Sequence, residues 1–191
     1  MAEPSRLILV KHSAVDVVPD QPPATWRLSA DGRARCAALA DRLAPFRPER
    51  ITSSVEPKAR ETAELVAARL GIPLGTAPDL HEHDRRNTAF LGANVFDAAV
   101  ARFFAEPDAL VLGHETAAAA ARRFDRAVVA VAAESTGETT CVIVTHGTVI
   151  ALFVAAHAGI EPLGLWRELS GGSCRFPRSS RSAGLTARSR P

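Results

Sequence analysis

The sequence predicts an α/β fold, a three-layer α/β/α sandwich with a mostly parallel central sheet. Two short, wholly apolar runs, residues 7–10 and 141–144, have the pattern of strands that are buried on both faces of a parallel sheet. A segment with helical periodicity follows each run, and strands that alternate with helices build such sandwiches. The chain of 191 residues is long enough for one hydrophobic core, so we expect a single domain over residues 1–173.

The first helix and the second strand are predicted next along the chain. Ser29 is a favourable N-cap residue, and the spacing of small and apolar side chains after it predicts a helix whose apolar face ends at Phe46. Residues 51–54 predict a second, weaker strand that leads into another helix. Ser53 and Glu56 have the spacing of a capping box, and the proline after Glu56 suits a first helical turn.

The rest of the chain is predicted to hold three more helices and one long loop. Apolar side chains at helical spacing mark the helices over residues 96–104, 117–131 and 148–158. Residues 80–94 fit neither period, and loops of that length in compact domains are often functional. Several side chains of this loop can contact a ligand and so select which ligand binds. They are Arg85, Arg86, Asn87 and Phe90.

Charge and hydropathy exclude several classes of partner. Residues 174–191 hold five Arg and no acidic residue, which predicts a basic C-terminal tail that is disordered or altered. Residues 1–173 carry 18 basic and 21 acidic side chains, so we expect no nucleic-acid partner. The longest apolar run, residues 149–156, is far shorter than the roughly 20 residues that span a bilayer. With no membrane span and no secretory signal pattern, we expect a cytoplasmic protein.

The two apolar strands end in similar residues. Lys11 and His12 directly follow the first strand, and His146 and Gly147 follow the last. Open α/β sheets place their sites at the carboxyl ends of strands, so these residues can meet although they are far apart in sequence. Lys58 lies in the first turn of the second helix, and the helix that begins at Gly147 offers free backbone N–H groups to an anion. The pattern predicts a phosphate-sized anion site.

These residues and their neighbours resemble the motifs of the histidine phosphatase superfamily, whose fold is phosphoglycerate-mutase-like. The resemblance spans about residues 6–169 in the family's order. The matching segments are Lys11-His12-Ser13 for the family's Arg-His-Gly, Ser53-Ser54 and Lys58-Ala59-Arg60-Glu61-Thr62-Ala63 for its second motif, Leu80-His81-Glu82 for a Leu-x-Glu after a third short strand, and His146-Gly147 for its closing His-Gly.

The resemblance implies a mechanism and a role for each residue. It assigns His12 as the nucleophile that takes the phosphoryl group, His146 as a neighbour that binds it, and Glu82 as the general acid. The phosphate-binding residues that it implies are Lys11, Lys58, Ser13 and Gly147. Water then hydrolyses the phosphohistidine, without a metal or another cofactor, and the substrate is a small phosphorylated molecule. Glu82 must keep a proton for the leaving group, so we expect burial to raise the pKa of its carboxyl group.

The sequence departs from the family pattern in the charged residues of this site. Both motif arginines are lysines, the only two lysines in a chain with 23 basic residues, and Ser13 replaces a glycine. Lysine keeps the charge but loses the planar two-pronged grip of arginine, which predicts weaker binding of the transition state. A binding or regulatory protein of the same fold, with negligible turnover, therefore stays open. A third interpretation is a metal hydrolase that uses His81, His83, Asp84 and His114.

The C-terminal region also differs from the family pattern. The family usually closes its sheet with a strand shortly after the position of residues 169–173, and no apolar strand is evident there. We expect that the C-terminus is altered or truncated, for example by a change of reading frame. The sheet would then have an open edge that can pair with another chain, which permits a homodimer.

Overall fold

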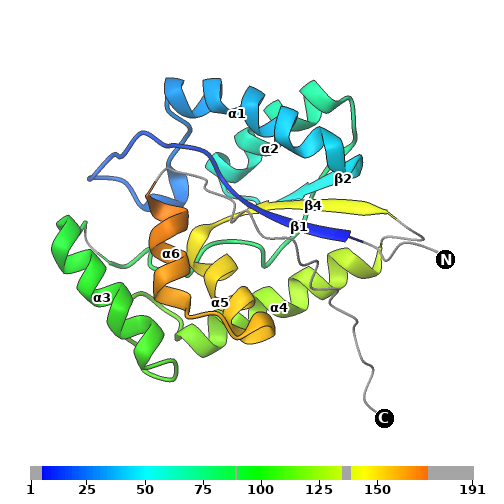
Figure 1. Cartoon of the computed structure of the whole chain (residues 1–191). Coiled ribbons are helices and arrows are strands. Elements are labelled where there is room, and N and C mark those ends of the chain that lie inside the picture. Colours follow the sequence, from blue (N-terminus) through cyan, green and yellow to red (C-terminus); the bar gives the residue numbers. More distant parts are fainter. Residues whose placement is uncertain (1–5, 89, 135–138, 172–191) are drawn as a thin grey trace, which may run out of the picture.

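A four-stranded sheet lies at the centre of the computed structural model, which describes residues 6–88, 90–134 and 139–171. All neighbouring strands are parallel, and their order across the sheet is β1-β4-β2-β3 (Figure 1). The strands are β1 (Arg6–Lys11), β2 (Pro48–Ser53), β3 (Leu74–Thr76) and β4 (Thr140–Thr145).

Helices cover both faces of this sheet, which confirms the predicted α/β/α sandwich. The helices are α1 (Ala30–Leu43), α2 (Pro57–Leu70), α3 (Ala93–Ala105), α4 (Ala117–Ala133), α5 (Gly147–Ala158) and α6 (Pro162–Ser170). Helices α1 and α2 pack on one face, where Val142 and Val144 of β4 point. Helices α4 and α5 pack on the other face against Cys141 and Ile143. Helix α6 contacts both α5 and α3 beside one end of the sheet.

The alternation of side chains along β4 explains why its sequence is wholly apolar. Every residue of β4 is buried, because β1 and β2 flank it and helices cover both of its faces. Strand β1 has a neighbour on one side only within the described part of the chain, and most of its residues are partly exposed. The two apolar runs were thus correctly predicted as strands, and β4 is the more central one.

The first helix ends earlier than its apolar pattern predicts. Ser29 caps α1 as expected, with its hydroxyl oxygen accepting the N–H of Gly32 at 3.0 Å. The helix stops at Leu43 because Pro45 cannot continue it, and a short 3-10 turn, η2 (Ala44–Phe46), follows. Phe46 is therefore 40% exposed instead of belonging to the helix's buried face.

The predicted capping box of the second helix is wrong. Ser53 is the last residue of β2, and the N-cap position of α2 is Glu56 with Pro57 at the first helical position. No side-chain hydrogen bond caps α2, because the Glu56 carboxylate turns to other partners that are described below. Ser54 and Val55 form the turn between strand and helix, which the spacing alone did not reveal.

In the middle and at the end of the chain, the structure contains one short strand that was expected and one helix that was not. Strand β3 is the expected third short strand before Leu80, and the loop after it runs to the start of α3 at Ala93. Helix α6 was not predicted. The tail, residues 174–191, lies outside the described residues, and so does any strand formed by it. No helix in the described ranges combines the length and the apolar character that a membrane crossing requires.

The sheet brings the predicted site residues together. Because β1, β4 and β2 are parallel neighbours, their carboxyl ends meet at one edge, with Lys11 paired to Thr145 and Ser53 paired to Val144. The backbone continues this pairing one residue further, where the N–H of His12 donates to the carbonyl of Thr145 at 2.9 Å. The residues that follow the three strands therefore surround a common space.

Candidate active site

A cavity of about 1000 Å³ opens at this edge of the sheet. Five of the predicted catalytic and phosphate-binding residues line it, together with an acid that was not predicted, Glu56. These five are Lys11, His12, Lys58, Glu82 and Gly147. The loop after β1, the loop after β3, and helices α3 and α6 form its walls. The cavity is much larger than a phosphate ion, so it has room for the rest of a ligand.

The His12 side chain has a defined tautomer. Its Nδ1 lies 2.8 Å from the backbone carbonyl oxygen of Ser13, and a carbonyl oxygen can only accept, so Nδ1 carries the proton. Burial, together with the nearby His146 and Lys58, holds the pKa of His12 well below its usual range. The ring is therefore neutral near pH 7, with a lone pair on Nε2. An uncharged imidazole with a free ring nitrogen can act as a nucleophile.

His146 lies beside His12 but is not part of the cavity wall. The two rings meet edge to face with centroids 5.3 Å apart, and the His146 side chain is fully buried. Its Nε2 lies 3.0 Å from the hydroxyl oxygen of Ser54, while Nδ1 has no hydrogen-bond partner among the described residues. Burial lowers the pKa of His146 to about 3, so this ring is also neutral. It lies beside the His12 ring and outside the surface that lines the cavity.

Ser13 also differs from its expected role, because its polar groups are already engaged. Its backbone N–H donates to the hydroxyl of Thr62 at 3.0 Å, and its own hydroxyl donates to the carbonyl of Gly32 at 2.8 Å. Gly32 has no room for a Cβ, since the backbone carbonyl of Ala14 lies against it. Ser13 thus fixes the turn after β1 to α1 and α2, and it does not line the cavity.

The two lysines hold different positions around the cavity floor. The Lys11 ammonium donates to the carbonyl of Leu169 near the end of α6 at 2.9 Å, and its aliphatic stem passes beside Gly147. Lys58 is only 5% exposed, and its ammonium donates to the carbonyl of Pro23 at 2.6 Å. Both side chains line the cavity, so their positive charges face the same space.

Glu56 is a site residue that the sequence analysis did not identify as one. Its Oε2 accepts from the Lys58 ammonium at 2.6 Å, and its Oε1 accepts from the backbone N–H of Glu82 at 2.9 Å. Oε1 also lies 3.7 Å from Nε2 of His146. Two carboxylates, Glu56 and Glu82, thus accompany the two lysines at the floor, where the charges balance. The capping-box spacing drew attention to Glu56, but for a different function.

Glu56→Gln is expected to strengthen the binding of inorganic phosphate. The carboxylate repels an anion and shares the Lys58 ammonium, so its neutralisation should lower the dissociation constant about tenfold, which corresponds to about 1.4 kcal/mol. Quenching of tryptophan fluorescence by phosphate measures this constant. Glu64→Gln, which alters an exposed ion pair with Arg60 on α2, is the control. Unchanged or weaker phosphate binding by Glu56→Gln would contradict the repulsive role of this carboxylate.

Glu82 is ionised in this structure, contrary to the expected raised pKa. Burial acts to raise the pKa of its carboxyl group, but the positive charge of Arg85 and backbone hydrogen bonds from His83 and Thr148 act against burial, and the pKa lies below the ordinary value. One of these hydrogen bonds comes from the N–H of Thr148 in the first turn of α5, at 3.2 Å. A helix N-terminus stabilises the charged form of a carboxylate. Glu82 therefore faces the cavity as a carboxylate in the free protein.

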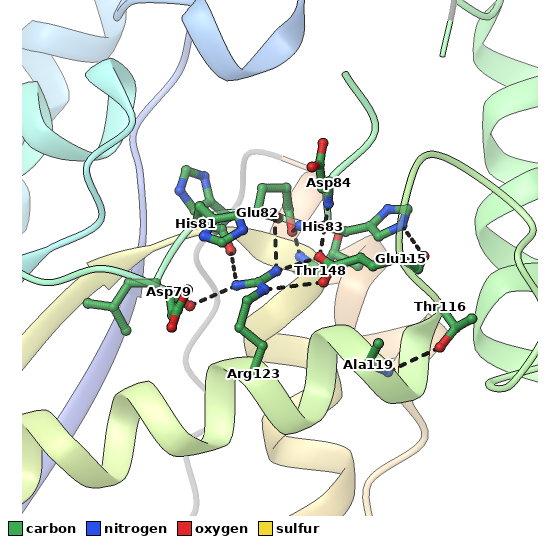
Figure 2. A network of polar contacts seen from close by, with 12 residues as sticks. Asp79, His81, Glu82, His83, Asp84, Glu115, Thr116, Ala119, Arg123 and Thr148 are labelled. Carbon is green, nitrogen blue, oxygen red and sulfur yellow. Dashed lines mark hydrogen bonds and ion pairs between the residues drawn. The ribbon is translucent and has the colours of Figure 1, made fainter. Parts of the chain in front are cut away.

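The Arg123 side chain of α4 holds the loop that carries Glu82, as Figure 2 shows. The Arg123 guanidinium donates to the carbonyls of Asp79 at 2.7 Å, His81 at 3.0 Å and Glu82 at 3.2 Å. It also pairs with Glu115 at 2.5 Å, whose carboxylate accepts the backbone N–H of Asp84 at 3.0 Å. The loop has no regular secondary structure, so these bonds fix the position of Glu82.

Three residues of the predicted metal alternative, His81, His83 and Asp84, line the cavity, but they do not form a group that could hold a metal ion. The Nε2–H of His83 donates to the carbonyl of Glu115 at 2.9 Å, and Asp84 forms an ion pair with Arg86 at 2.6 Å. His81 lines the cavity, whereas His114 is exposed and lies near Asn87. Within the described ranges, no three His, Cys, Asp or Glu side chains are grouped closely enough to hold a metal ion.

The loop residues that were expected to contact a ligand divide into two pairs. Arg85 and Arg86 line the cavity, and the Arg85 guanidinium lies over the ring of Phe96, 4.8 Å from its centroid. Asn87 and Phe90 are not part of the wall, and Phe90 is exposed. Two tryptophans that the sequence analysis did not consider, Trp26 and Trp166, line the cavity as well.

Comparisons with known proteins agree with this fold. The model of the histidine phosphatase superfamily (branch 1) matches residues 7–175. No curated protein matches the sequence. Among solved structures, the chain is similar to a mycobacterial glucosyl-3-phosphoglycerate phosphatase, with 24% identity, coverage of 85% of this chain and 83% of that one, and a TM-score of 0.69. It is also similar to an α-ribazole phosphatase from Shigella flexneri, with 20% identity, coverage of 85% and 84%, and a TM-score of 0.66.

Proposed function

The chain belongs to branch 1 of the histidine phosphatase superfamily, and from this membership we propose that it hydrolyses a phosphomonoester through a phosphohistidine on His12. The observation that carries the proposal is the neutral His12 ring, whose Nε2 is unprotonated and whose side chain lines a cavity beside two lysines. The solved structures to which the chain is similar include phosphatases of small phosphorylated molecules, which supports a substrate of this class.

The first chemical step transfers the phosphoryl group to His12. The lone pair of Nε2 forms a bond to phosphorus, and the bond between phosphorus and the ester oxygen breaks. The leaving oxygen takes a proton from Glu82. In the second step, Glu82 removes a proton from water, the water oxygen attacks phosphorus, and the phosphorus–nitrogen bond breaks to release phosphate and restore the neutral ring.

Substrate binding can cause Glu82 to take up the proton that the first step requires. In the free protein its carboxyl group is ionised, since the pKa lies below the ordinary value. A phosphate group placed beside it adds negative charge, which favours the protonated carboxyl group. Substrate binding and proton uptake are then coupled, and the expected acid forms only when the ligand is present.

The lysines and α5 stabilise the charge of the transferring group. The ammonium groups of Lys11 and Lys58 line the cavity beside His12, and the first turn of α5 begins at Gly147 on the same wall. Positive groups that are already in place around a transferring phosphoryl group supply most of the catalysis in such reactions. Lys11 and Lys58 offer point charges without the geometry of an arginine fork, so we expect modest turnover.

A protein that binds a phosphorylated ligand without appreciable turnover is the second candidate. The observation that favours it is the ion pair between Lys58 and Glu56, which reduces the positive charge available to phosphate. In this case the same cavity would hold the ligand, and the His12 nucleophile would remain unused.

Hydrolysis of p-nitrophenyl phosphate in the presence of EDTA separates the candidates. Turnover that resists the chelator and disappears in His12→Ala supports the phosphohistidine mechanism. Binding of phosphate by a wild-type protein with no turnover supports the binding protein. Activity that is lost on chelation and restored by a divalent metal would overturn the metal-independent mechanism.

A further inference from the structure

We propose that the substrate's leaving group carries a planar aromatic ring, which binds between the aromatic side chains of the cavity wall. This inference rests on the proposed function, because it concerns the part of the substrate that lies beyond the phosphate. Trp26, Phe96 and Trp166 come from three separate parts of the chain and line one cavity. Aromatic side chains offer flat faces and edges that favour contact with another ring.

The wall beyond the phosphate position is mainly apolar. The loop between β1 and α1 contributes most of this surface, and Val55, α3 and α6 complete it. The apolar lining residues are Val15, Val17, Pro23, Ala24, Trp26, Val55, Ala93, Phe96 and Trp166. Val17 and Val55 are more than half exposed to solvent here, although both are large apolar side chains. A ligand that covers them removes apolar surface from water.

The aromatic side chains are held in fixed positions. The rings of Phe96 and Trp166 meet edge to face, with centroids 5.9 Å apart. The planar guanidinium of Arg85 lies over the ring of Phe96, so a cation–π contact extends this surface towards Glu82. In the loop between β1 and α1, the indole N–H of Trp26 is shared between the carbonyls of Val18 and Gln21 at 3.0 and 3.1 Å. Its polar group is thus satisfied by the protein.

Two ion pairs lie on the same wall. Arg86 pairs with Asp84 at 2.6 Å, and Arg167 pairs with Asp97 at 2.6 Å. A sugar ring presents several hydroxyl groups that need hydrogen-bond partners once they leave water, and the apolar side chains that make up most of this wall offer none. An aromatic ring needs no such partners. The wall therefore favours an aromatic leaving group over a carbohydrate.

Primary alkyl phosphates test this preference, since their leaving oxygens are chemically alike. We expect kcat/KM for 2-phenylethyl phosphate to exceed that for glucose 6-phosphate and for glycerol 1-phosphate by about tenfold or more. Trp166→Ala should lower kcat/KM for 2-phenylethyl phosphate about tenfold and that for glycerol 1-phosphate much less. Phe96→Leu keeps an apolar side chain and removes the flat ring. It should therefore lower the ratio of kcat/KM for 2-phenylethyl phosphate to kcat/KM for glycerol 1-phosphate without a change in folding. The control is Phe46→Ala, which alters an exposed aromatic residue that does not line the cavity.

A binding measurement separates this proposal from the phosphatase mechanism. Both tryptophans of the chain line the cavity and the chain has no tyrosine, so its tryptophan fluorescence reports on this space alone. We expect 2-phenylethylphosphonate, which cannot be hydrolysed, to bind at least about tenfold more tightly than methylphosphonate. Equal binding of the two phosphonates, or a preference for glucose 6-phosphate in turnover, would overturn the aromatic subsite. Tight phosphonate binding without turnover of any ester would overturn the phosphatase mechanism and leave the subsite standing.

Discussion

His12→Asn is expected to abolish turnover of phosphomonoesters. Asparagine has nearly the same size and can still donate to the Ser13 carbonyl, but it lacks a nucleophilic ring nitrogen at the position of Nε2. Loss of a nucleophile that forms the covalent intermediate should lower kcat by more than about 10³-fold. The fold should be retained, because the backbone N–H of His12 keeps its bond to Thr145. Circular dichroism and the melting temperature check this retention.

The proposed phosphohistidine intermediate can be detected directly. Wild-type protein that is mixed with substrate and quenched in alkaline denaturant should carry a phosphoryl group on the peptide that contains His12, because phosphohistidine survives alkali and is lost in acid. His157→Asn is the matched control, since this exposed histidine on α5 pairs with Asp125 at 2.6 Å and does not line the cavity. Labelling of a different residue, or unchanged turnover in His12→Asn, would show that His12 is not the nucleophile.

The positions of His12 and His146 were predictable because they depend on local patterns. Each histidine lies two residues after the end of a run of four apolar residues, and such runs become parallel strands whose ends meet at one edge of the sheet. The roles of single side chains were less predictable. Whether Ser13 faces the cavity or the neighbouring helices depends on Thr62 and Gly32, which lie far away in the sequence.

The residues that were missed act through contacts between distant segments. Arg123 is one of 21 arginines, and nothing in its surroundings in the sequence marks it as the residue that holds the Glu82 loop. Glu56 was visible only as part of a capping pattern, and its pairing with Lys58 appears only when the turn after β2 is built. The pKa of Glu82 depends in the same way on the first turn of α5 and on Arg85. Such effects need the three-dimensional structure.

Glu82→Gln is expected to slow the hydrolysis of alkyl phosphates by about 10²- to 10⁴-fold, the usual contribution of a positioned general acid. The effect on p-nitrophenyl phosphate should be much smaller in the first step, because p-nitrophenolate leaves without a proton. Single-turnover measurements with 2-phenylethyl phosphate and p-nitrophenyl phosphate isolate this step. Glu106→Gln, which alters an exposed ion pair with Arg102, is the control. An equal loss for both substrates would mean that Glu82 orients the phosphate and does not protonate the leaving group.

The pH dependence of stability tests the ionised state of Glu82 without reference to catalysis. Its pKa in the folded protein lies below the ordinary value of 4.5, so the charged carboxylate stabilises the folded state above that pH. This contribution should be lost as the pH falls through the folded-state pKa, where the carboxyl group takes up a proton. The melting temperature of the wild type should therefore exceed that of Glu82→Gln near pH 7, and the difference should shrink below pH 4.5. A difference that grows on acidification would mean that the folded protein holds Glu82 protonated, ready to act as an acid before any substrate binds.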